Sequence, residues 1–157
     1  MTTRLGLTLA AIVGAASVIA PAPAAAQDAG VTGAAEATFP DGATFNGLPL
    51  KGLTLGQGLF IAQDGSATGQ FQVVLQGTSP LGTPQNVTVE GEVRGGSVGA
   101  DGSATFSGTA TIDMGDGTPA LPGVPFTVTA SAGSLGLILN AVALPTATVT
   151  AGSITTK

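Results

Sequence analysis

The stretch ATFSGTATIDM, residues 104–114, decides the fold class, because apolar and polar side chains alternate along its whole length. One face carries Ala, Phe, Gly, Ala, Ile and Met, and the other carries Thr, Ser, Thr, Thr and Asp. A period of two residues is typical of a β-strand with one buried face and one solvated face. The stretch therefore predicts a half-buried antiparallel strand.

The same period recurs along most of the chain. Further alternating runs occupy residues 67–77, 86–94, 124–130 and 147–151. Residues 53–62 form a less regular run, with Phe60 on the face opposite the leucines. Residues 135–142 are apolar nearly throughout, which fits either a central strand buried on both sides or a short helix.

Turn signals separate these runs. Asp-Gly pairs recur, and the pentapeptide Asp-Gly-Ser-Ala-Thr occurs at both 64–68 and 101–105, which we interpret as one hairpin opening used twice. Short connections between eight or nine strands predict an all-β fold, an antiparallel meander. A β-sandwich is slightly preferred over a closed up-and-down barrel.

The amino-terminal 26 residues have the three parts of a secretory signal peptide. Arg4 precedes the apolar run 5–20, and alanines at 24–26 supply a small-residue cleavage site. We expect cleavage after Ala26, a flexible leader over 27–35 and a single β-domain over 36–157. The signal and composition look bacterial, so the expected location is periplasmic or extracellular.

The residue types that the chain lacks limit its chemistry. It contains no His, Cys, Trp or Tyr, which removes the usual base of a serine triad, thiol chemistry and most aromatic stacking. Without Arg4, three cations and nine carboxylates remain, giving a formal net charge of −6. A chain this acidic has no positively charged surface that could bind the phosphates of a nucleic acid. We predict a protein that is not an enzyme, binds no nucleic acid and needs no cofactor.

Two acidic pairs are the candidate sites. Asp113 and Asp116 lie in a loop that resembles a calcium loop only superficially, and they are the candidate calcium ligands. Glu90 and Glu92 project from one strand face about 6.6 Å apart, a separation that suits inverting glycosidases but also any i, i+2 pair. We interpret the glutamates as a charged outer face that keeps the sheet from pairing with others.

Three classes of function remain open. The favoured one is an exported, non-enzymatic β-domain with a structural, envelope-associated or interaction role, whose partner is an unknown protein or envelope component. The alternative is a small β-barrel carrier of an apolar small molecule, since inward glycines and alanines would leave space inside. An outer-membrane β-barrel is less favoured, because the chain lacks aromatic girdles. The mature chain is expected to have no membrane span.

Overall fold

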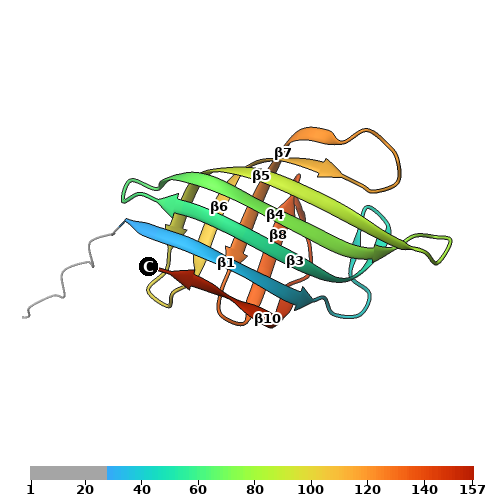
Figure 1. The fold of residues 1–157 in the computed structure, drawn as a ribbon, viewed down its shortest axis with the longest axis horizontal. Helices are drawn as coiled ribbons and strands as arrows, with labels where there is room; N and C mark the ends of the chain where they lie inside the picture. Colours follow the sequence, from blue (N-terminus) through green and yellow to red (C-terminus); the bar gives the residue numbers. More distant parts are fainter. Residues whose placement is uncertain (1–27) are drawn as a thin grey trace, which may run out of the picture.

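The computed structural model describes residues 28–157, so the predicted signal peptide lies outside the described residues. This part of the chain is all-β and antiparallel, as the alternation predicts. Figure 1 labels most of its strands. The strands are β1 (Ala29–Thr38), β2 (Thr44–Phe45), β3 (Leu48–Ile61), β4 (Ser66–Thr78), β5 (Pro84–Val98), β6 (Ala104–Asp113), β7 (Leu121–Ala130), β8 (Ser134–Leu139), β9 (Val142–Ala143) and β10 (Ala147–Thr156).

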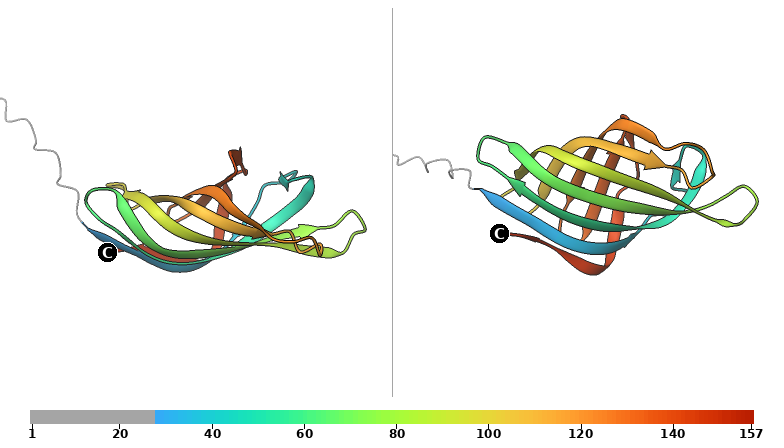
Figure 2. Two further views of the ribbon diagram at one scale, coloured as in Figure 1. Left: turned by 90° about the horizontal axis from the view of Figure 1, so that it is seen from above. Right: turned by 45° about the horizontal axis from the view of Figure 1, so that its top comes forward.

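All ten strands belong to one sheet, and its hydrogen bonds form a ring. Consecutive strands pair from β3 through β8, and β10 pairs with β8 over only two residue pairs. The ring closes because β1 pairs with β10 on one side and with β3 on the other. In Figures 1 and 2, β1, β3, β4 and β5 cross steeply over β6, β7 and β8, so two layers of the same sheet face each other.

The core fills the space between these layers. The inward residues of every long strand join one apolar cluster, and its largest fully buried members include Phe106, Leu75 and Leu139. The rings of Phe71 and Phe126 lie with their centroids 4.2 Å apart, and Phe106 packs edge-on against both. In β4, β5, β6 and β7 the apolar face that the period of two predicts is therefore the face that packs inward, whereas in β10 Ala147 is buried and Ala151 is exposed.

Two segments differ from their predicted structure. Residues 29–35, expected as part of a flexible leader, lie in β1, where Val31 is completely buried. Because inward residues such as Ala35 are small, hydrophobicity alternates only weakly along this segment, and the sequence pattern did not predict a strand there. Residues 134–139 form strand β8 rather than a helix, and Ile138 is 40% exposed, so this strand is buried on one face only.

Three of the turns share one local structure, which explains the repeated pentapeptide. In each turn an aspartate Oδ1 accepts hydrogen bonds from the backbone N–H and the hydroxyl of the residue two positions on, at 2.9–3.0 Å and 2.6 Å. The glycine between them has a φ of 79–85°, which L side chains rarely adopt. The aspartates of these turns are Asp64, Asp101 and Asp116.

Candidate functional site

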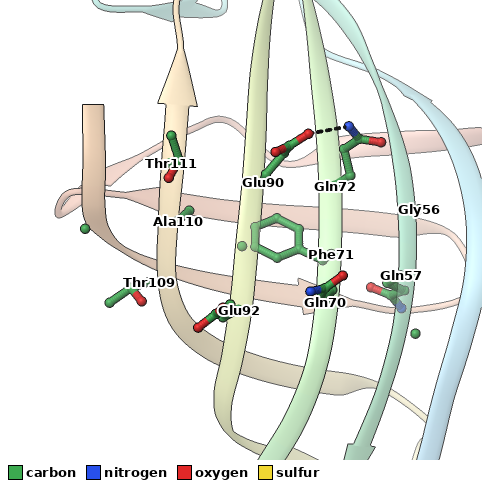
Figure 3. A pocket seen from close by; sticks show the side chains of 13 residues that line it. Gly56, Gln57, Gln70, Phe71, Gln72, Glu90, Glu92, Thr109, Ala110 and Thr111 are labelled. Atoms are coloured by element: carbon green, nitrogen blue, oxygen red, sulfur yellow. Dashed lines mark hydrogen bonds between the residues drawn. The ribbon is translucent and has the colours of Figure 1, made fainter. Parts of the chain in front are cut away.

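A groove of about 730 Å³ crosses the outer face of the sheet over β3, β4, β5 and β6. The strand register places its outward residues in two parallel rows. One row runs Gly56, Gln72, Glu90, Thr111, and the other runs Gly58, Gln70, Glu92, Thr109. Figure 3 labels the polar side chains of both rows in a close view of the groove. The polar members of both rows are glutamines, glutamates and threonines, all of which form hydrogen bonds.

The carboxylates of the groove are only partly engaged within the protein. The Gln72 side-chain amide donates a hydrogen bond to Oε1 of Glu90 at 3.0 Å, drawn as the dashed line in Figure 3. Arg94 lies 4.0 Å from Oε2 of Glu92, and both side chains are about 70% exposed. An exposed pair at that distance contributes little. Glu92 is therefore open to an external partner.

Glycines make up the β3 side of the groove and keep it open. A Cβ atom built on Gly56 or on Gly58 would meet no other atom within 4 Å, and neither residue has a positive φ. Packing inside the protein therefore does not require glycine at these two positions. Their lack of a side chain leaves room on the outside of the sheet, next to Gln70 and Gln72.

Gly91, between the two glutamates, has the opposite role. A Cβ atom on this residue would point inward, collide with the Phe71 ring and come within 2.9 Å of Cε1 of Phe126. Gly91 thus lets two aromatic rings close the core directly beneath the groove. The inward glycine leaves no free space there, because the rings fill it.

Gln57 is the polar residue at the boundary between groove and core. It pairs in register with Phe71 and shares its inward face, while also contributing to the lining of the groove. Both its side-chain Oε1 and Nε2 are buried and have no hydrogen-bond partner within the protein. A buried amide without partners costs roughly 1–3 kcal/mol. Gln57 therefore destabilises the domain unless water or a bound group reaches it.

The candidate calcium ligands Asp113 and Asp116 each accept hydrogen bonds within their own turn. Asp113 Oδ1 accepts a hydrogen bond from the backbone N–H of Gly115, and Asp116 Oδ1 accepts two from Thr118. The hydrogen bond from the Thr118 hydroxyl lowers the pKa of Asp116 below its ordinary value. Within residues 28–157 neither aspartate belongs to a cluster of three or more potential metal ligands. Calcium binding here stays a prediction.

The cavity between the two layers has little room for a ligand. An apolar cavity between the layers, lined by residues such as Leu53, Val128 and Leu137, has a volume of about 10 Å³. That is close to the space one water needs, whereas small-molecule sites measure roughly 300–1,000 Å³. The outer groove is thus the larger candidate site.

Sequence reasoning found part of this site. It placed Glu90 and Glu92 on one outward face, but interpreted them as a charged surface that keeps the sheet from pairing with others. It also placed Gln70, Gln72 and the threonines of β6 on outward faces, but did not join them to the glutamates, because that requires the strand register.

Comparisons with known proteins add no relative. No family model, no curated protein and no solved structure matches this chain. None of the described residues forms a helix of the length and hydrophobicity needed to cross a bilayer.

Proposed function

We propose that this protein is an exported, non-enzymatic interaction domain that binds a polar partner in the outer groove of β3–β6. The observation that carries the proposal is that two rows of polar side chains lie beside Gly56 and Gly58, two glycines that packing inside the protein does not require. Gly56 and Gly58 leave room for a partner beside the polar rows.

The two alternatives are less well supported. A carrier of an apolar molecule needs internal volume, and the cavity between the layers measures about 10 Å³. A strand that faces lipid carries apolar residues outward. The outward positions at the centre of β4 and β5 are instead Gln70, Gln72, Glu90 and Glu92. Both observations favour a polar interaction surface.

Filling the groove tests the proposal. Gly58→Phe places a ring in the groove, where no atom lies within 4 Å of the new Cβ. Gly30→Phe is the matched control, because Gly30 of β1 is equally open but lies outside the groove. We expect Gly58→Phe to abolish binding of polar peptides or oligosaccharides seen with the unaltered protein, and Gly30→Phe to retain it. Binding that survives both Gly56→Phe and Gly58→Phe would refute the proposal.

Export and the carrier alternative have separate tests. Mass spectrometry of the protein from the exported fraction should give the mass of residues 27–157, and a mass that includes residues 1–26 would contradict cleavage. A co-purifying apolar molecule, removable by organic extraction, would favour the carrier.

A further inference from the structure

We propose that the partner of the groove is an extended peptide segment with cationic side chains at alternate positions. This inference rests on the proposed function and names the occupant of the same groove. Its basis is the charge of the two rows. Their two ionisable members, Glu90 and Glu92, are both acidic, and the other members are amides, hydroxyls and glycines.

The spacing of the glutamates selects the form of the partner. Residues i and i+2 of a strand lie about 6.6 Å apart on one face, and the same interval separates alternate side chains of an extended peptide. A peptide that lies parallel or antiparallel to β5 can therefore place a Lys or Arg against Glu90 and another against Glu92. Its intervening side chains point away from the sheet.

The surrounding groups complete the match. Gln72 donates to Glu90 through Nε2 and so holds this carboxylate in place over β5. Gln70 lies opposite Glu92 in the strand register and is exposed, so its amide can donate to and accept from a peptide backbone. Gly56 and Gly58 leave room beside these amides for the backbone itself.

The observations favour a peptide over a sugar chain. Sugar-binding grooves use exposed aromatic rings, but the aromatic residue of this groove, Phe71, is only 3% exposed and lies beneath Gly91. The domain also carries an overall negative charge, which attracts a cationic segment before contact.

The test uses the full mature protein and a blocked hexapeptide of alternating Lys and Thr. Titration calorimetry at low salt is expected to detect binding that weakens as ionic strength rises. The double variant Glu90→Gln/Glu92→Gln should lower the affinity about five- to tenfold. Glu36→Gln is the matched control, because it removes one exposed charge from β1 outside the groove and should change the affinity less than about twofold.

Peptides of Glu-Thr and Ser-Thr and a neutral oligosaccharide separate the outcomes. Equal binding of the Ser-Thr peptide, or an equal effect of Glu36→Gln, would overturn the cationic inference. Binding of the oligosaccharide alone, blocked by Gly58→Phe, would also overturn it but would leave the proposed groove function intact. If no probe responds to Gly58→Phe, both proposals fail.

Discussion

Replacing Gly91 with alanine adds one methyl group where the core has no space for it. The new Cβ would overlap the ring of Phe71 and approach Phe126, and both rings are at least 97% buried. Forcing a methyl group into a packed core costs roughly 1–3 kcal/mol. A Gly to Ala change also stabilises by about 0.4–1 kcal/mol through the unfolded chain. We therefore expect Gly91→Ala to lower the free energy of unfolding by about 1–2 kcal/mol.

Urea denaturation followed by far-UV circular dichroism measures this loss, since the chain has no Trp for fluorescence. Gly56→Ala is the control, because its Cβ enters open space and should leave stability unchanged or slightly raised. The Phe71→Leu background removes ring atoms from the collision, so Gly91→Ala should cost about 1 kcal/mol less there. Equal costs in both backgrounds, or equal stability of Gly91→Ala and Gly56→Ala, would refute the packing argument.

Four further predictions concern single side chains. Gln57→Met replaces an amide without partners by an unbranched apolar side chain, so the free energy of unfolding should rise by about 1–3 kcal/mol; a fall would mean that water or another group already satisfies Gln57. Leu75→Ala, at a fully buried position, should lower the free energy of unfolding by about 2–5 kcal/mol. Leu81→Ala, at a 91% exposed hairpin tip, should change the free energy of unfolding by less than about 0.5 kcal/mol. Similar Tm values for the two variants would contradict the assigned burial. The Ser66 hydroxyl and N–H lower the pKa of Asp64 in the folded state, so Ser66→Ala should move this pKa up toward 3.8 in a carboxyl NMR titration. The stabilisation that Asp64 contributes is present above its unfolded pKa and is lost as pH falls through the folded pKa. An Asp64 pKa that does not change in Ser66→Ala would contradict this prediction. If Asp113 and Asp116 bind calcium, millimolar calcium should raise the Tm and Asp116→Asn should remove the rise, while no difference from magnesium would end that hypothesis.

The sequence predicted strands best where inward residues are large. The alternation in β4 and β6 depends on side chains such as Phe71 and Phe106, which bury much area and stand out against threonine and glutamine. β1 was missed because its inward residues are mostly alanine and glycine, whose burial comes from the partner strands β3 and β10 rather than from their own bulk. No local pattern predicts such pairing.

The groove could not be predicted from the sequence for a related reason. Its rows depend on four strands in a fixed register, with Gly58 opposite Gln70 and Glu92 opposite Thr109. Shifting any one strand by a single residue would turn its polar members inward. The sequence alone supplied only the pair within one strand, Glu90 and Glu92. It also suggested that inward glycines would leave space, whereas Phe71 fills the space at Gly91.

The position of β1 between β3 and β10 has a consequence for how the chain folds during synthesis. β1 and β3 can pair as soon as both have been made, but the other edge of β1 stays open until β10, the last described strand, is present. Val31 pairs with Thr156, so these contacts span almost the whole domain. Contacts that distant in sequence form slowly, and an open strand edge promotes aggregation meanwhile. A chain stopped before Ala147 would retain most strands and yet remain permanently in that exposed state.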